Sequence, residues 1–579
     1  MIRIAHNAVH ARLFDAPREA KLEVHRLLSY KVDGVEHMAA FQNSGWDGQS
    51  SYFSHAKDSF PAGFVRLVAQ GLRKAGYEIQ IVAKPLPEPL GPELPEVDPF
   101  GYTERYDYQP KAIDQLIRHG NIIVQVATGG GKSRIARMAM RRINRPTLFL
   151  TTRGILMHQM RKAIETMEGS SCAVLGDGAW GIPYRKPDGS EARRLTKFTV
   201  GMVQTLAQRL AVKTVGPEYE ALRNRRATTA GKKIEAMRKK LAAAKTPPTE
   251  AREQMRLLIE KLDQELPTDA QDRAEAERKV AEHERLRLAT VEILKRFELV
   301  IAEEAHEVSG DSFYNVMCAL PNARYRMALT ATPFMKDDQA ANMNLLAACG
   351  PVAIQITEKL LIDRGILAKP YFKFVQLAEA DKPKGLFRST GWHRAYELGI
   401  VTNLARNKAI CQELMLATRH GLNGMVLVQH KAHGELLLDM LGKVGLRAMF
   451  IYGEDNQDER QAALAALGDG SIDVLIGSTI LDVGVDVPSI GIVVLAGGGK
   501  AEVSLRQRVG RGLREKKGHL PNIALIVDFA DDFNTHLLTH ARQRRAIIEA
   551  TPSFVEGIVR DFDYRGLGLK PRAPEAIAA

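Results

Sequence analysis

The stretch Asn121–Ser133, NIIVQVATGGGKS, decides the fold of this chain. Its apolar run Ile122–Val126 predicts a buried strand, and three glycines end that strand before Lys132 and Ser133. Residues 134–142 contain helix-forming residues without glycine or proline and predict a helix. A strand, a glycine turn, Lys-Ser and a helix make a phosphate-binding loop. The glycines let backbone N–H groups converge on phosphate oxygens, and the helix N-terminus adds the positive end of its dipole.

This loop predicts ATP as the substrate and Mg²⁺ as the cofactor. Lys132 is expected to reach the β- and γ-phosphates, and the Ser133 hydroxyl to ligate Mg²⁺. Val126 stands where the usual pattern begins with glycine, a departure that matters little. The alternative is a glycine-rich turn that only caps a helix, which the Lys-Ser pair in frame after a strand disfavours. The predicted nucleotide-binding residues of the loop are Thr128, Gly129, Gly130, Gly131, Lys132 and Ser133.

Length and charge limit the possible classes of protein. A chain of 579 residues is long for one core, and three or four domains are expected. The net charge of +13 and the isoelectric point near 9.4 favour an anionic partner, with nucleic acid as the first candidate. The four cysteines form no C-x-x-C pair, so neither a zinc site nor a disulfide framework is expected. The first residues lack a signal-peptide core and no stretch is long enough to span a membrane, so we expect a cytoplasmic protein without a membrane partner.

Local patterns divide the chain into units. Residues 1–83 are expected to form a small α+β module, with helix patterns at 17–30 and 60–75 and an alternating strand at 77–82. Residues 84–100, KPLPEPLGPELPEVDPF, are so rich in proline that they predict an extended linker.

From Gly101 onward strands alternate with helices, which predicts an α/β fold with mostly parallel sheets. The first series of strands is expected at 147–151, 198–203, 299–302 and 325–329; the second is expected at 425–429, 448–452, 473–477, 491–496 and 523–528. Only the first series contains a phosphate loop. We therefore expect two similar domains, 101–360 and 361–550, with the nucleotide held between them, and a C-terminal tail at 551–579.

Two carboxylates follow a predicted buried strand in Glu298–His306, ELVIAEEAH. Glu303 is expected to hold Mg²⁺, and Glu304 to orient and deprotonate the attacking water. An acidic solvated loop is the alternative. The stretch 329–333, LTATP, follows another strand, and the hydroxyls of Thr330 and Thr332 are expected to link the acidic pair to the opposite domain.

Residues 507–514, QRVGRGLR, carry arginines at helical spacing. Arg511 and Arg514 are three residues apart, so they share a helix face. Two guanidinium groups directed at a γ-phosphate would stabilise the charge of the transition state. Taken alone, the same run could be only a basic helix.

The order of these motifs resembles that of superfamily 2 helicases and translocases over about residues 105–550. YQPKAI around Gln109 resembles the adenine-reading Q motif, and VATGGGKS resembles motif I. The other motifs expected in the first domain correspond to TTRG at 151–154 (motif Ia), VQTL at 203–206 (motif Ib), EEAH at 303–306 (motif II) and LTATP (motif III). Those expected in the second domain correspond to VQHKAHG at 428–434 (motif IV), GSTILDVGVDVP at 477–488 (motif V) and QRVGRGLR (motif VI). The family usually has Asp where Glu303 stands, which leaves the metal coordination open.

The resemblance implies two RecA-like motor domains and a role for further residues. Gln109 would bind adenine, Asp486 would contact the ribose of ATP, and Gln507 would belong to the catalytic set with Arg511 and Arg514. His306 would couple the acidic pair to Thr330 and Thr332. The residues implied to contact the nucleic-acid backbone are Thr152, Arg153, Thr205, Ser478 and Thr479.

The N-terminal module indicates which group within superfamily 2 the chain resembles. GWDG (45–48), FPAGF (60–64) and GYEIQI (76–81) are similar to the front module of phage UvsW-like recombination helicases, and DFADDFNTHLLTHARQRR (528–545) is similar to their closing segment. This implies action on duplex and branched DNA: junction migration, fork regression and R-loop removal, in a bacterial or phage-infected cytoplasm. An RNA helicase, the motor of a restriction or defence system and a non-hydrolysing clamp are the alternatives.

A long segment, residues 216–296, separates motifs Ib and II. Its Lys/Arg/Glu/Ala-rich composition, thin apolar stripes and prolines at 247, 248 and 267 predict two or three helices packed as an antiparallel, coiled-coil-like hairpin. The first arm is strongly basic. A solvated face and a DNA-clamping arm are equally compatible with this pattern.

Overall fold

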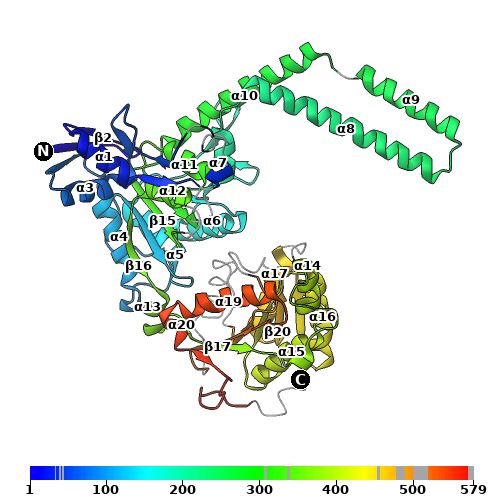
Figure 1. Cartoon of the computed structure of the whole chain (residues 1–579). Helices are drawn as coiled ribbons and strands as arrows, with labels where there is room; N and C mark the ends of the chain where they lie inside the picture. Colours follow the sequence, from blue (N-terminus) through cyan, green and yellow to red (C-terminus); the bar gives the residue numbers. More distant parts are fainter. Residues whose placement is uncertain are drawn as a thin grey trace.

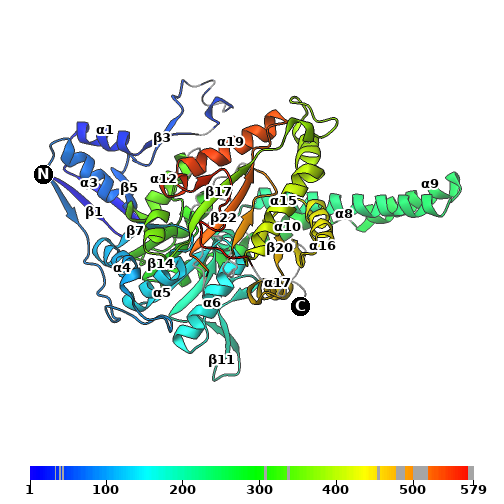
Figure 2. The same ribbon diagram turned by 90° about the horizontal axis from the view of Figure 1, so that it is seen from below.

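The computed structural model describes the chain except for residues 33, 38–40, 42, 44, 266, 306–309, 335–338, 453–456, 478–489, 500–519 and 572–579, and except for the side chains of residues 37, 263–265 and 457. The described part contains two large sheets of mostly parallel strands, a small N-terminal α+β module and a three-helix arm (Figures 1 and 2). The predicted α/β fold class is confirmed.

The N-terminal module is a four-stranded mixed sheet with two helices on one face. Its strands, in the order β5-β2-β1-β6, are β1 Ile2–His6, β2 His10–Phe14, β5 Ser59–Pro61 and β6 Ile79–Val82, and its helices are α1 Arg18–Leu27 and α3 Val65–Lys74. The helix predicted at 60–75 begins only at Val65, because Ser59–Pro61 pair with β2 and residues 62–64 form a single 3-10 turn.

This module is docked on the first motor sheet. Its apolar core continues into α12 (Gln339–Cys349) through Ala347, and Tyr52 donates a hydrogen bond to Asn344. The backbones approach closely, since a Cβ on Gly63 would lie 2.1 Å from the carbonyl oxygen of Leu346. The N-terminal module is therefore packed directly against the first motor unit.

The proline-rich stretch 84–100 has no regular secondary structure, as expected, but it lies along the first motor unit. The N–H groups of Leu90 and Gly91 donate to the carbonyls of Ile143 and Arg142, at 3.1 and 3.0 Å. Asp98 accepts from the Nε of Arg134 at 2.9 Å. The extended stretch is hydrogen-bonded along the surface of this unit, which the sequence did not predict.

The first large sheet has the strand order β10-β9-β13-β8-β14-β15-β7-β16 and is parallel except for β10. Its strands are β7 Asn121–Val126, β8 Thr147–Thr151, β9 Ala173–Gly176, β10 Ala179–Trp180, β13 Phe198–Met202, β14 Leu299–Glu303, β15 Tyr325–Thr330 and β16 Val352–Ile356. Every strand predicted for this series is present. The three missed strands, β9, β10 and β16, lie toward the sheet edges.

The second large sheet is parallel throughout, with the order β19-β20-β18-β21-β22-β17-β23. Its strands are β17 Lys369–Val375, β18 Gly424–Leu427, β19 Ala448–Ile451, β20 Val474–Gly477, β21 Ile492–Val494, β22 Ile523–Phe529 and β23 Ile558–Val559. The five predicted strands are present, while β17 and β23 were missed.

The C-terminal end of the described chain adds to this second sheet. Strand β23 pairs with β17, and Phe562 and Leu569 are buried in the core beside β22. Residues 551–571 therefore do not form a separate tail, and we propose that the second motor unit extends to about residue 570.

The segment between motifs Ib and II forms three helices that project away from the first unit as an arm (Figures 1 and 2). They are α8 Val215–Ala243, α9 Pro248–Glu265 and α10 Asp269–Leu294. The breaks fall at the predicted prolines, and Thr268 with Gln271 forms a capping box at the start of α10. Figure 1 shows α9 diverging from α8, and Leu257 and Ile259 are 53% and 42% exposed. The predicted helical insert of three helices is present, and α9 separates from α8 along part of its length.

Candidate nucleotide and nucleic-acid site

Five of the six predicted motifs of the first unit follow strands of one sheet and meet at the carboxyl ends of those strands. The phosphate loop follows β7, LTATP ends β15, and the two acids end β14, and these three strands are neighbours. TTRG follows β8 and VQTL follows β13, which are the next two strands. Because parallel strands place their carboxyl ends on the same side, all five motifs border one surface.

The phosphate loop needs its glycines. Gly131 caps α5 (Lys132–Ile143) with a φ of +83°, a left-handed conformation that side chains rarely adopt. A Cβ on Gly131 would also lie 2.6 Å from the Nε2 of Gln109, and one on Gly130 would lie 2.6 Å from the Cγ1 of Val126. The helix that begins at Lys132 turns the N–H groups of its first turn toward the loop.

The two acids meet the two polar residues of this loop. Glu303, at the end of β14, is 4% exposed, and its Oε1 accepts a hydrogen bond from the Ser133 hydroxyl at 3.3 Å. Lys132 forms an ion pair with the Oε1 of Glu304, a residue with a φ of +50°. Left-handed backbone at a non-glycine residue is strained and is typical of functional sites.

Burial raises the pKa of Glu303 to about 7, and the Glu304 carboxylate adds to this rise; Lys132 and the hydrogen bond from Ser133 oppose it. A buried carboxylate beside a hydroxyl is a hard-oxygen donor set of the kind that Mg²⁺ takes in proteins. The residues therefore fit the predicted metal. Because the Glu303 side chain already reaches Ser133, the extra methylene relative to Asp does not separate the two donors.

Gln109 lies directly under the phosphate loop. It is 1% exposed, and its Oε1 accepts from the Nη1 of Arg134 at 2.8 Å. Its buried Nε2 has no acceptor within the described part of the chain. The neighbouring Tyr108 donates its hydroxyl to the carbonyl oxygen of Gly130 at 3.0 Å. Tyr108 and Gln109 thus pack against the phosphate loop and support it. A contact of Gln109 with adenine is a separate proposal.

The predicted nucleic-acid residues of the first unit lie close together. Thr151 of β8 is the register partner of Met202 of β13, so the loops after these strands are adjacent. The Nε2 of Gln204 donates to the carbonyl oxygen of Thr152 at 2.9 Å and joins the two loops. Arg153 and Thr205 are half-buried beside this contact.

Between the acids and the phosphate loop lie the two threonines of LTATP. The hydroxyl of Thr330, a buried residue, accepts from the N–H of Thr332 at 3.2 Å. The Thr332 Oγ1 is buried and has no hydrogen-bond partner among the described residues. The remaining predicted site residues lie outside the described residues: His306, Ser478, Thr479, Asp486, Gln507, Arg511 and Arg514.

Sequence reasoning missed that the connection between the two sheets packs on the phosphate loop. This connection runs from β16 through α13 (Glu358–Asp363) to β17. A Cβ on Gly129 would lie 2.6 Å from the Cδ2 of Leu367, which is itself buried. Arg105 and Arg364 each donate to the other's carbonyl oxygen, at 2.9 and 3.1 Å, which ties the connection to the segment before Gln109. No local pattern announces these long-range contacts.

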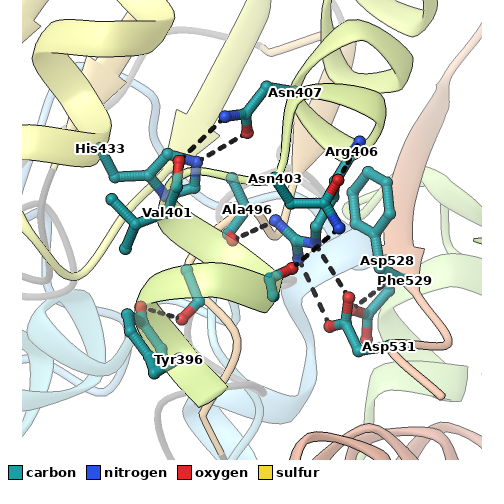
Figure 3. A network of polar contacts seen from close by, with 12 residues as sticks. Tyr396, Val401, Asn403, Arg406, Asn407, His433, Ala496, Asp528, Phe529 and Asp531 are labelled. Carbon is teal, nitrogen blue, oxygen red and sulfur yellow. Dashed lines mark hydrogen bonds and ion pairs between the residues drawn. The ribbon is translucent and has the colours of Figure 1, made fainter. Parts of the chain in front are cut away.

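A second glycine loop, Ala496–Gly499, follows β21 in the second unit and leads into residues 500–519. Its four consecutive carbonyl oxygens each accept a hydrogen bond from a different side chain. The donors are Arg406 Nη1 to Ala496 at 2.7 Å, Tyr396 OH to Gly497 at 2.5 Å, Gln429 Nε2 to Gly498 at 3.2 Å and Arg544 Nη1 to Gly499 at 3.0 Å. Figure 3 shows Arg406 and Tyr396 approaching this loop from the helical side.

Buried acids neutralise the two arginines of this network. Arg406 is fully buried; its Nε donates to Asp531 Oδ1 at 2.9 Å, and its guanidinium lies 4.1 Å from the ring centre of Phe529 (Figure 3). Arg544 donates to both oxygens of Asp528, and these carboxylates hold its pKa above the ordinary value despite burial. Sequence reasoning missed Arg406; the segment 528–545 was noted only through its resemblance. The network fixes the backbone at which the chain enters residues 500–519.

None of the helices in the described part of the chain is long and apolar enough to cross a membrane.

Comparison with known proteins assigns both motor units. Residues 103–335 match the family of the type III restriction enzyme res subunit, and residues 405–516 match the helicase conserved C-terminal domain. The ATP-dependent DNA helicase uvsW of Enterobacteria phage T4 is 24% identical over 243 residues, 42% of this chain and 47% of that protein. The DNA 3'-5' translocase XPB2 of Sulfurisphaera tokodaii is 26% identical over 280 residues, 42% of this chain and 61% of that protein.

The chain thus spans about half the length of these curated relatives. The crystal structure of T4 UvsW aligns over 96% of this chain and 98% of its own, with 17% identity and a TM-score of 0.40. Through its two domain families, the chain belongs to superfamily 2 of the ATP-dependent helicases and is related to UvsW.

Proposed function

We propose that this protein is an ATP-dependent DNA translocase that remodels branched DNA in recombination, repair or replication, in a bacterial or phage-infected cytoplasm. One observation carries the proposal: a glycine loop with Lys132 and Ser133, two neighbouring carboxylates, and the two adjoining loops that we propose contact nucleic acid all lie at the carboxyl ends of neighbouring strands of one sheet. Because these groups share one end of the sheet, hydrolysis of a bound nucleotide can change how the protein binds a nucleic acid.

Lys132 changes partner when ATP binds. In this structure it is paired with Glu304, and the γ-phosphate, with a larger negative charge, competes for the same ammonium group. Release of Lys132 leaves the Glu304 carboxylate available to accept a proton from the attacking water. Bound Mg²⁺, held by Ser133 and Glu303, would supply charge neutralisation at the β- and γ-phosphates.

Hydrolysis is coupled to motion through contacts on both sides of the loop. On one side Leu367 touches Gly129, so a shift of the phosphate loop displaces the connection to the second sheet. On the other side Thr330 and Thr332 lie between the acids and the loop. Arg511 and Arg514 of the second unit complete the site when the two units close, and Asp486 contacts the ribose.

The protein binds its track, the DNA along which it moves, through the sugar-phosphate backbone. Thr152, Arg153 and Thr205 of the first unit, with Ser478 and Thr479 of the second, contact phosphates of one strand. Contacts of this type are independent of sequence and weaken as salt rises. Alternating closure and opening of the two units then moves the protein along duplex DNA.

The N-terminal module supplies a surface for a second DNA arm. The sheet face opposite α1 and α3 is hollowed by a groove of about 620 Å³, and no carboxylate is present among the residues that line it in the described structure. The cationic, imidazole and aromatic side chains of the groove are His6, His10, Arg12, Lys57, Lys84 and Phe14. Since the module is docked on the motor, a duplex bound in the groove would be held at a fixed angle to the track.

A strand-exchange assay tests the proposal. The protein is incubated with ATP and labelled four-way junction, fork, R-loop, blunt DNA duplex or RNA duplex, and the products are resolved on a gel. Junctions and forks should be dissociated and blunt duplex should persist. Preference for the RNA duplex would replace the proposal by the RNA-helicase alternative.

Charge removal in the groove tests the role of the module more cleanly than its deletion, which would expose the apolar face of α12. The triple variant Arg12→Gln, Lys57→Gln, Lys84→Gln should lose junction activity by about tenfold while its ATPase on linear duplex stays near wild type. The control, Arg18→Gln, Arg73→Gln, Lys74→Gln, removes the same charge from exposed positions of α1 and α3. Equal effects of the two variants would exclude the groove.

A restriction or defence motor is the second candidate, because residues 103–335 match the res subunit family. That function requires a nuclease. ATP-dependent cleavage of plasmid DNA by the protein with cell extract, absent with extract alone, would favour it over branch remodelling.

A further inference from the structure

The three-helix arm carries two kinds of basic residue, and they are separated along α8. In the part near the motor, acids of α10 neutralise the cations. Arg226 forms ion pairs with Asp272 and with Glu275, and Arg223 lies 3.8 Å from Asp269. This proximal charge serves the packing of α8 on α10.

The distal part of α8 lacks such partners. It carries five exposed cations, and a sixth, Lys245, follows just beyond the end of the helix; the five are Lys232, Lys233, Arg238, Lys239 and Lys240. Within the described structure only Lys239 has an acidic partner, Glu235 of the same helix at 3.9 Å. Among the acids of α9 whose side chains the structure describes, Glu253 and Glu260 pair with Arg256 of their own helix and Glu250 accepts a hydrogen bond from Gln254.

Four of these lysines form one face. Lys232 and Lys239 are seven residues apart, as are Lys233 and Lys240, so they stand in two adjoining rows with a spacing of about 10 Å. The row of Lys232 and Lys239 continues toward the motor with the exposed Arg225, for a total length of about 20 Å. Arg226, in line with the other row, is paired with acids of α10 and is not part of this face. The other side of α8 carries Ile234, Met237 and Leu241, which are half-buried or buried.

We propose that this lysine face of distal α8 binds the phosphate backbone of duplex DNA outside the motor site. The inference rests on the proposed function for the identity of the track. A straight row of ammonium groups is complementary to a stiff polymer with charges at regular intervals, and lysine binds phosphate as a point charge without base specificity.

The position at which the arm joins the first motor unit favours DNA, and not an acidic protein, as the partner of the lysine face. The arm continues from α7 (Val203–Leu210), whose first turn carries Thr205, a predicted backbone contact. His283 of α10 is hydrogen-bonded to the carbonyl oxygen of Ala211 at 2.8 Å, which fixes α10 to the start of the arm. DNA gripped at Thr205 would therefore lie at the base of the arm that carries the lysine rows.

The test compares two fourfold variants of the full-length protein. The first is Lys232→Gln, Lys233→Gln, Lys239→Gln, Lys240→Gln. The control, Arg278→Gln, Lys279→Gln, Arg285→Gln, Arg287→Gln, removes the same charge from α10, where acids are in excess. Circular dichroism and thermal unfolding establish that both variants keep the fold, and duplex binding is measured by fluorescence anisotropy from low to moderate salt.

The distal variant should bind duplex about 100-fold more weakly at low salt, with the slope of log K against log salt flatter by about 3, and its ATPase without DNA should be unchanged. Equal slopes in the distal variant and the control would overturn the arm proposal while leaving the motor proposal intact. Absence of duplex binding by the wild-type protein would overturn the motor proposal itself. Polyglutamate serves as a second probe: loss of polyglutamate binding with retained DNA binding would assign the face to an acidic protein and overturn the inference.

Discussion

The two motor units each place a glycine loop after a parallel strand, and the loops have opposite roles. Ala127–Gly131 follows β7 and runs into helix α5, so peptide N–H groups and the positive helix end face the site. Ala496–Gly499 follows β21, and its four carbonyl oxygens are bonded by side chains. Glycine content is similar, but the direction of the peptide groups differs.

This difference shows that a glycine loop becomes an anion site only when its N–H groups are left available. In the first unit Lys132 and Ser133 reinforce that polarity. In the second unit Arg406 and Arg544 donate hydrogen bonds to carbonyl oxygens of the loop and hold its backbone in place. The two units therefore divide the work: one holds the nucleotide, and the other holds the backbone that precedes residues 507–514.

The largest effect is expected in the first loop. Lys132→Ala should abolish ATP turnover because it removes the proposed phosphate contact, the ion pair with Glu304 and the positive charge near buried Glu303. Glu304→Gln should bind ATP and fail to hydrolyse it. DNA-stimulated phosphate release and binding of a fluorescent ATP analogue measure the two effects, with Lys162→Ala on the exposed side of α6 (Gly154–Glu168) as control. Normal turnover by Glu304→Gln would remove it from the general-base role.

The next largest effect is expected beyond the second loop. Arg511→Ala and Arg514→Ala should each lower kcat by a factor on the order of 10³–10⁵, with little change in ATP affinity, since a transition-state contact is lost. Steady-state ATPase measurements give kcat and KM separately. If both variants keep normal kcat, the arginine run is only a basic helix.

Removing the side chains that donate hydrogen bonds to the second glycine loop should lower the stability of the second unit. Arg406→Ala removes the nearer of the two arginines that pair with Asp531, leaves only Arg544 at 3.5 Å, and should lower the free energy of unfolding by about 3–5 kcal/mol. Tyr396→Phe removes only the donor to Gly497 and should cost about 1–3 kcal/mol. Denaturant unfolding compares both with Arg419→Ala, an exposed position on α15 (Leu404–Arg419). If Arg406→Ala and Arg419→Ala had equal midpoints, the network would contribute nothing to the second unit.

The smallest effect concerns the pH dependence of the first site. The folded protein holds the Glu303 proton up to about pH 7, while the unfolded chain releases it near pH 4.5, so ionisation of Glu303 lowers stability as pH rises between these values. Without nucleotide or metal, Glu303→Gln should therefore be more stable than wild type at pH 8, by up to about 3 kcal/mol, and similar at pH 4.5. Thermal unfolding at the two pH values measures the difference; the same increment at both would show that charge is not the cause.

Sequence reasoning found the motifs of the first unit because each is a short pattern that follows a strongly apolar strand. It placed β7, β8, β13, β14 and β15 correctly, and parallel pairing then brought their loops together. It failed at the sheet edges. β23 has only two residues, and β17 contains Pro370 and two lysines, so neither gives the apolar run by which a buried strand is recognised. β16, VAIQI, does carry such a run and was overlooked.

The sequence by itself determined the α/β class, the order of the strands along the chain and the chemistry available at their ends, because periodicity and short motifs are local properties. Only the tertiary structure decided that the proline-rich stretch is hydrogen-bonded along the first motor unit, that Leu367 rests on Gly129, and that Arg406 and Arg544 hold the backbone of the second glycine loop. These contacts join residues tens to hundreds of positions apart. Their partners are selected by packing and by the need to satisfy buried polar groups, which no local pattern encodes.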